Sequence, residues 1–186
     1  MAELAAAGYR VRSLADLRHS GVRYREAITV LLDWLPQVTD RRVKEEIVRA
    51  LTVPWARPAA TRPMIDEFRR VDSSVDPTGT GLRWTIGNAL EVLADDSSFD
   101  ELAELVRDRR YGTARQMIVL GLGRSKRPEA VEVLVDLVDD PEVDGQAVKA
   151  LGRLRAPAAR AALESKRDDK RAWVRREARR ALERLP

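Results

Sequence analysis

Few side chains in this sequence could carry out acid–base or nucleophilic chemistry. There is no cysteine, which excludes a thiol nucleophile, a thiolate metal site and a disulfide. For the one histidine, His19, near an expected helix end, we predict a solvated or capping role. The carboxylate pairs Glu101/Glu104 and Glu132/Asp136 lie on helices that we expect to face outward into solvent. The sequence therefore favours a non-enzymatic protein with no cofactor and no metal ion.

One pair of residues indicates binding instead. Trp84 and Asn88 are four positions apart, so on a helix they lie on the same side, one turn from each other. We expect Gly145 opposite them, where it would leave room. An indole and an amide above such a depression could hold a peptide side chain or a base. In the alternative interpretation, Trp84 packs into a neighbouring helix because the groove is narrow.

The composition favours helices, and the charge is unevenly distributed. Apolar residues make up 44% of the chain, charged residues 34% and aromatic residues 5%. The net charge of +4 divides into +3 over residues 1–60, −5 over 61–140 and +6 over 141–186. Because the middle is acidic, a continuous nucleic-acid-binding face is not indicated.

Neither a secretion signal nor a membrane span is expected. The opening "MAELAAAGYRVR" has a short apolar run that follows an acidic residue rather than a basic region. No stretch approaches the roughly 18 apolar residues that a spanning helix needs. We expect a soluble cytoplasmic protein that does not bind a membrane.

A repeat of about thirty residues organises the chain. Leu122-Gly123-Arg124 and Leu151-Gly152-Arg153 are 29 residues apart, as are Pro128 and Pro157. Further copies place leucines at equivalent points, in steps of 29 to 39 residues: Leu51, Leu90, Leu122, Leu151 and Leu182. We assign the longest step to an insertion, "DSSVDPTGTG". Such spacing, without predicted strands, is typical of a helical solenoid.

The repeat predicts five helix pairs after a short leading helix at 13–19, which Ser13 would cap. The first helices of the pairs are predicted at 24–35, 58–71, 98–109, 128–138 and 157–165. The second helices are predicted at 42–53, 80–94, 113–124, 142–154 and 172–184. The pairs span about residues 24–184, and we expect one domain over 1–186.

Local signals agree with these boundaries. We place Pro58, Pro128 and Pro157 in first helical turns, where a missing N–H costs nothing. Ser98 is predicted to cap the helix that follows it. Apolar residues of one second helix recur at spacings of three and four, and small ones among them let neighbouring helices approach: Val143, Ala147, Ala150, Leu151 and Leu154.

The second helices resemble the HEAT-like repeats first noticed in phycobilin lyases. The signature V-R-x-x-A-x-x-A-L-G/x-x-L stands as "WVRREARRALERL" at the end of the chain and less fully in four earlier helices. The resemblance covers about residues 24–184 and implies an all-α, right-handed α-solenoid of about five helix-pair repeats. It also implies a binding scaffold whose second helices line the concave side.

One row within this signature is basic: Lys44, Arg83, Arg115 and Arg175, with Asp144 in the fourth pair. In a structural interpretation, each basic side chain pairs with an aspartate between repeats, such as Asp40, or caps a neighbouring carbonyl. In a functional interpretation, the row contacts an acidic ligand. The structural interpretation is favoured.

The face opposite the apolar stripe is the predicted binding surface. Its residues are Trp84, Asn88, Gln116, Gln146, Lys149, Arg176 and Arg180, with Trp84 as the anchor. We expect Trp173, at the start of the last helix, to be a partly exposed end cap. Arg160 to Arg184 holds ten basic and five acidic residues, which indicates a solvated face or a docking site for an acidic partner.

The predicted function is a protein-interaction scaffold that binds a protein or a peptide segment along its concave face. The alternative is nucleic-acid binding through the basic C-terminal end. It includes a resemblance to HEAT-like alkylpurine DNA glycosylases, which use a groove with a Trp and an Asp. Here Asn88 stands in the place of that acid, and an amide cannot supply the carboxylate that stabilises an oxocarbenium-like state.

Overall fold

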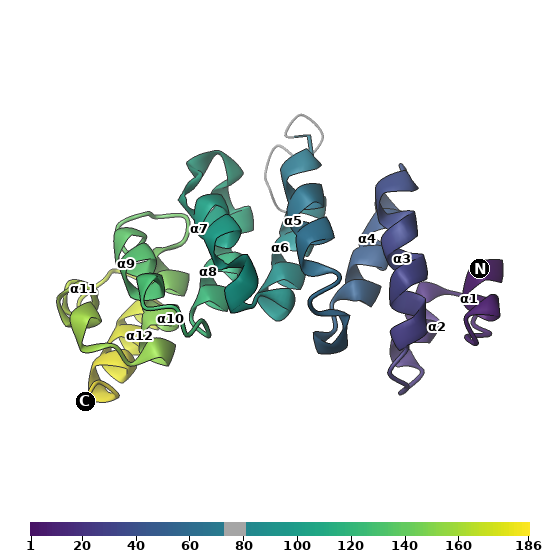
Figure 1. Ribbon diagram of the computed structural model, residues 1–186. Helices are drawn as coiled ribbons and strands as arrows, with labels where there is room; N and C mark the ends of the chain where they lie inside the picture. Colours follow the sequence, from purple (N-terminus) through teal and green to yellow (C-terminus); the bar gives the residue numbers. More distant parts are fainter. Residues whose placement is uncertain (73–80) are drawn as a thin grey trace. The chain divides into compact units, whose positions relative to one another are not determined.

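The computed structural model describes residues 1–72 and 81–186, and every regular element in these ranges is a helix. The chain divides into two compact units, Met1–Leu93 and Ala94–Pro186. Figure 1 labels the helices of both. Within the described ranges, none of the helices combines the length and the apolar character needed to cross a membrane. The fold is the all-α solenoid type that the sequence predicts, whereas the single domain over 1–186 stays a prediction.

The first unit contains two short leading helices and two helix pairs. The leading helices are α1 (Ala2–Ala6) and α2 (Leu14–His19). The pairs are α3 (Arg25–Gln37) with α4 (Arg41–Leu51), and α5 (Thr61–Arg70) with α6 (Leu82–Leu93). A 3-10 turn, Pro54–Ala56, links the pairs. The second helices α4 and α6 pack on each other, so this unit contains one complete step of the solenoid.

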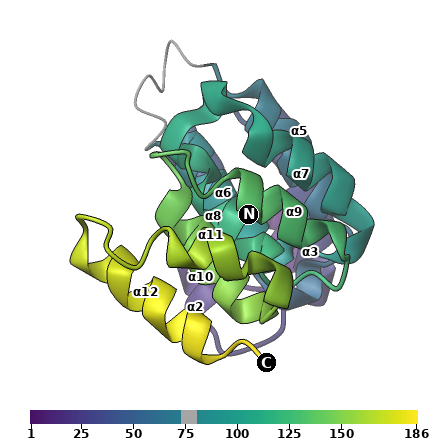
Figure 2. The same cartoon turned by 90° about the vertical axis from the view of Figure 1, so that its left-hand side faces the viewer.

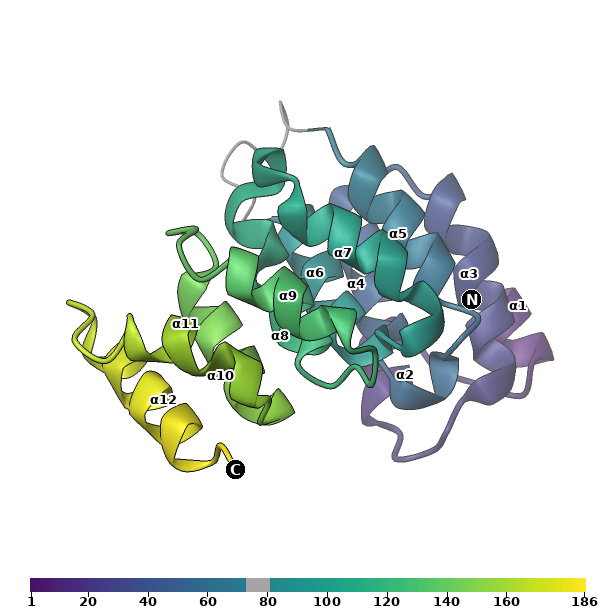
Figure 3. The same cartoon turned by 60° about the vertical axis from the view of Figure 1, so that its left-hand side comes forward.

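The second unit contains three helix pairs. They are α7 (Phe99–Arg107) with α8 (Gln116–Leu122), α9 (Glu129–Asp136) with α10 (Asp144–Leu154), and α11 (Arg160–Glu164) with α12 (Ala172–Glu183). The 3-10 turns are Asp96–Ser98, Arg109–Arg115 and Pro157–Ala159. Figures 2 and 3 show α10 beside α12, and α8 and α12 both pack on α10.

The five predicted pairs are confirmed, and all of their helices except α3 are shorter than expected. The helix predicted at 113–124 begins only at Gln116, because Gly112 adopts φ 49° and ψ −136° and interrupts the helical backbone before it. Helix α1 was not predicted. The insertion predicted at 72–81 falls largely on residues 73–80, which lie outside the described residues.

The repeated leucines and small residues form the core. Leu51, Leu90 and Leu151 are fully buried and Leu122 nearly so, whereas Leu182, on the last helix, is half-buried. The small residues do permit close approach. A methyl group on Gly123 would lie 2.7 Å from the Cα of Ala150, and one on Gly152 would lie 2.8 Å from the Cβ of Ala181. The stacking of α8, α10 and α12 therefore depends on these glycines.

The predicted helix caps are confirmed in part. The Ser13 hydroxyl accepts a hydrogen bond from the Asp16 N–H at 3.0 Å, as expected. The prediction for Ser98 is wrong, because its side chain does not cap α7. Asp95 instead accepts from the N–H of Ser98 at 3.2 Å and caps the 3-10 turn before α7.

The predictions for the three prolines are also confirmed only in part. Pro128 directly precedes the first residue of α9, and Pro157 opens the 3-10 turn that leads into α11. Pro58 does not stand in a first turn, since α5 begins only at Thr61.

Candidate functional site

The basic row points into the protein and stabilises its repeats. Lys44 pairs with Glu67 on the next helix pair. The buried Arg83 guanidinium donates to the carbonyl oxygens of Phe68, at 3.2 Å, and Val71. The Asp40 carboxylate, expected as such a partner, instead accepts from the Val43 N–H at 3.0 Å and caps α4.

In the second unit the row behaves in the same way. Arg115 is fully buried and donates to the Val106 and Gly112 carbonyls and to the Asp140 carboxylate, each at 2.9 Å. Burial raises the pKa of Asp140, but hydrogen bonds, above all from Arg115, outweigh it and hold the pKa below its ordinary value. Arg175 donates to the Asp169 carbonyl at 2.7 Å. The structural interpretation of the row is therefore confirmed.

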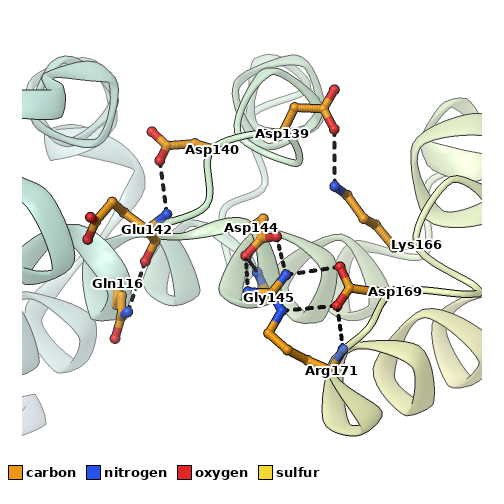
Figure 4. A network of polar contacts seen from close by, with 9 residues as sticks. All are labelled: Gln116, Asp139, Asp140, Glu142, Asp144, Gly145, Lys166, Asp169 and Arg171. Atoms are coloured by element: carbon orange, nitrogen blue, oxygen red, sulfur yellow. Dashed lines mark hydrogen bonds and ion pairs between the residues drawn. The ribbon is translucent and has the colours of Figure 1, made fainter.

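Between the fourth and fifth pairs the charges are exchanged. Asp144 occupies the position of Arg115, 29 residues later, and Asp169 stands 29 residues after Asp140. The guanidinium comes from the loop instead of the helix: Arg171 donates to Asp144 at 2.9 Å and to Asp169 at 3.0 Å. Figure 4 shows Arg171 between the two carboxylates. An acid in the basic row is thus compensated by a base in the following loop.

We expect this arrangement to make the stability of the protein depend on pH. The hydrogen bonds from Arg171 lower the pKa of Asp169 from 3.8 to about 2. A carboxylate with a depressed pKa stabilises the fold above its unfolded-state pKa, and this contribution is lost as the pH falls through the folded-state value. We predict that Asp169→Asn lowers the free energy of unfolding at neutral pH, and that the deficit shrinks between about pH 4 and pH 2.

Urea unfolding at a series of pH values measures this deficit. Asp168→Asn is the control, because that carboxylate is 95% exposed and lies 3.9 Å from Arg179. It should leave stability within about 0.5 kcal/mol of the wild type. A deficit of Asp169→Asn that stays constant down to about pH 2 would contradict the assignment.

Trp84 and Asn88 lie together in one pocket of the first unit. The pocket has a volume of about 330 Å³ and is lined by Arg49, Thr52, Trp84, Thr85 and Asn88, from α4 with the residue after it and from α6. Trp84 is 40% exposed, so part of its indole is accessible from the pocket. Thr52 was not predicted, because it follows the end of α4 and lies off the repeat pattern.

The chemistry of the pocket walls is close to neutral. The Arg49 guanidinium is paired with Glu46 at 2.7 Å and Glu45 at 3.1 Å. The hydroxyl of Thr52 donates to the Val48 carbonyl at 2.7 Å, which leaves its oxygen free to accept a hydrogen bond. The pocket therefore offers an indole surface and polar groups, with no uncompensated charge.

The expectation for Gly145 is wrong. Gly145 belongs to the second unit, and its missing side chain makes room for Trp173: a methyl group on Gly145 would lie 1.9 Å from the Trp173 ring. Trp173 itself is 38% exposed. The depression predicted for a ligand is thus covered by an indole from α12.

The other predicted site residues lie in the second unit, on α8, α10 and α12. The Gln116 amide donates to the Glu142 carbonyl at 2.9 Å, and Gln146 is half-buried (Figure 4 shows Gln116). Lys149, Arg176 and Arg180 are exposed, and Arg180 lies 3.5 Å from a carboxylate oxygen of Glu177.

The groups considered for chemistry do not form a reactive cluster. Glu104, Glu132 and Asp136 are exposed, and His19 is exposed in the last turn of α2. Over residues 1–72 and 81–186, no three His, Cys, Asp or Glu side chains gather as metal ligands would.

Comparison with known proteins agrees with this architecture. No curated protein matches the chain at a significant level. Residues 99–183 match the family model of HEAT repeats, a segment that begins with the first residue of α7 and ends with the last of α12. The match does not identify the repeats as the phycobilin lyase type, which stays a prediction. It supports a HEAT-like repeat family for this protein, carried by the three helix pairs of its second unit.

Proposed function

We propose that this protein is a non-enzymatic interaction scaffold that binds a protein or a peptide segment, with the Trp84 pocket as its anchor site. HEAT repeats commonly serve as scaffolds for protein interaction. The observation that carries the proposal is an exposed tryptophan in a pocket on the second-helix face, whose other four lining residues carry polar groups. Large aromatic side chains in such positions dominate the affinity of many interfaces.

Asn88 indicates how the ligand would be oriented. Among the described residues, no hydrogen bond holds its side chain to the rest of the protein, and it lies one helical turn from Trp84. A side-chain amide carries a donor and an acceptor side by side, which match the C=O and N–H of a peptide main chain. An extended segment would bond Asn88 through its main chain and lay an uncharged side chain on the Trp84 indole.

The second unit supplies further polar groups in this proposal. Gln116, Gln146, Lys149, Arg176 and Arg180 would supply polar contacts to a bound protein. Their contribution concerns orientation and rate of association more than affinity, since exposed charges are screened by salt.

A displayed library of short peptides tests the proposal. Peptides selected on the wild type should bind Trp84→Ala at least about 30-fold more weakly, which is the loss of a hot spot of roughly 2 kcal/mol. Fluorescence anisotropy of labelled peptides measures the affinities. The melting temperature should change little, because Trp84 lies outside the core.

Val43→Ala is the matched control, because Val43 is another exposed apolar residue of the same unit, 47% exposed on α4. It should bind the selected peptides as the wild type does. Equal binding by Trp84→Ala, or a large fall in its melting temperature, would show that Trp84 is not the anchor.

A further inference from the structure

The last helix exposes one continuous stripe of aromatic and cationic side chains. Trp173, Arg176, Arg180 and Arg184 follow one another at intervals of three, four and four residues. At 3.6 residues per turn, these positions fall within an arc of about 80° on α12 and its first following residue. The opposite face of α12 is the core face, with Val174, Ala178 and Ala181.

The neighbouring helix α10 extends the stripe into a cationic surface. Gly152 of α10 packs on Ala181 of α12, and Trp173 of α12 lies over Gly145 of α10, so that the two helices are in direct contact. Figure 2 shows them side by side. Lys149 on α10 occupies the repeat position that Arg180, 31 residues later, occupies on α12. The Lys149 side chain is exposed. We call Lys149, Trp173, Arg176, Arg180 and Arg184 the cationic stripe.

The charge of this stripe is only partly compensated. Arg180 has Glu177 at 3.5 Å, and Glu183 is the other acidic residue of α12. Within the residues that the structure describes, no ion pair engages Lys149, Arg176 or Arg184. The first helices α7 and α9 differ, because they carry exposed carboxylates at Asp100, Glu104, Glu132 and Asp136. An anionic partner is therefore attracted to the second-helix side.

We propose that the cationic stripe binds an acidic segment of a polypeptide, with an apolar side chain of the segment on Trp173. This inference deepens the proposed function and rests on the chain being a protein-binding scaffold. The spacing fits: Cα atoms four residues apart on α12 are about 6 Å apart along the axis, and alternate residues of an extended strand are separated by about 6.6 Å. Carboxylates at alternate positions would meet Arg176, Arg180 and Arg184 in turn.

The indole distinguishes a polypeptide from a nucleic-acid duplex. Trp173 keeps 38% of its surface exposed at the end of the stripe, and burying it requires an apolar group from the partner. A duplex presents its sugar–phosphate backbone outward and offers no such side chain. Single-stranded nucleic acid could stack a base on the indole, and the experiment includes it for that reason.

Three labelled probes test the proposal on the full chain at about 50 and 200 mM salt. The first is a peptide of about ten residues with one leucine followed by alternating glutamates, the second has glutamine in place of glutamate, and the third is an oligothymidylate of similar length. The glutamate peptide should bind most tightly. The glutamine peptide should bind at least about tenfold more weakly, because it lacks the charges that the stripe attracts.

The variant Arg176→Gln/Arg180→Gln should lose about tenfold or more in affinity for the glutamate peptide. The matched control Arg160→Gln/Arg167→Gln removes the same charge from exposed positions on and just after α11, and it should bind like the wild type. Trp173→Ala should weaken the binding of the same peptide. Melting curves show whether each variant is folded.

The outcomes separate the two proposals. Equal losses in both double variants, absence of glutamate-peptide binding, or tighter binding of the oligothymidylate would each overturn the acidic-segment proposal. Binding of the glutamate peptide is measured separately from binding of the library-selected peptides, because the cationic stripe and the Trp84 pocket lie in different units. If the library-selected peptides do not bind at the Trp84 pocket, the result for the cationic stripe is therefore unaffected. If the glutamate peptide does not bind, the result for the Trp84 pocket is likewise unaffected.

Discussion

Arg115→Leu should lower the free energy of unfolding by about 3–5 kcal/mol, the largest stability loss we expect from one side chain of the second unit. The substitution removes a fully buried guanidinium. It leaves the Asp140 carboxylate buried without its main partner, and the Val106 and Gly112 carbonyls without their donor. A buried charge that loses its partner costs far more than an exposed ion pair contributes.

Urea unfolding at neutral pH measures this loss, with Arg109→Leu as the control. Arg109 lies 3.5 Å from the same carboxylate but is 75% exposed, so its removal should cost no more than about 1 kcal/mol. Combining Arg115→Leu with Asp140→Asn should recover part of the loss, because the uncompensated charge is then gone. A loss below about 1 kcal/mol for Arg115→Leu would contradict this account of the basic row.

The basic row also shows where sequence reasoning reaches its limit. The repeat, with its steps of 29 to 39 residues, places Arg115 in one row with Lys44 and Arg83, and all three side chains pair within the protein. Their main partners include backbone carbonyls, such as those of Phe68 and Val106, and every residue has a carbonyl. The sequence alone therefore leaves both the structural and the functional interpretation of the row open, because it does not show which carbonyl groups lie near each basic side chain. The exception, Asp144 with Arg171, could have been found by extending the repeat comparison into the loops.

The helices were predictable because their apolar stripe recurs with the repeat. Positions such as Leu90 and Leu151 must be buried for a helix pair to stack, and this constraint sets the centre of each helix. The helix ends depend on local backbone geometry instead. Gly112, for example, takes a positive φ that delays the start of α8 to Gln116.

Trp84 and Gly145 also differ in how far the sequence predicts their surroundings. The apolar face of α6 was complete without Trp84, so its exposure could be inferred from one helix. The surroundings of Gly145 depend on how α12 is rotated against α10, and this rotation brings Trp173 over the glycine. Contacts between successive repeats are therefore harder to predict than the faces of a single helix.

Gly123→Val should lower the free energy of unfolding by about 3 kcal/mol or more, because it forces two second helices apart. Even a single methyl group at this position would lie 2.7 Å from the Cα and 3.0 Å from the carbonyl oxygen of Ala150. These are backbone atoms of α10, so no side-chain rotation relieves the overlap. Gly123→Ala should cost less, about 1–3 kcal/mol, since it adds fewer atoms to the same contact.

Ala161→Val is the control, because it adds a β-branched side chain at an exposed position of α11 and should cost no more than about 1 kcal/mol. The loss of unfolding free energy in Gly152→Ala should lie between those of the control and of Gly123→Ala. Its methyl group would lie 2.8 Å from the Ala181 Cβ but 3.4 Å from the Ala181 Cα. Urea unfolding of the full chain ranks the four variants. A Gly123→Val protein as stable as Ala161→Val would mean that the close approach of α8 and α10 is not what holds these repeats together.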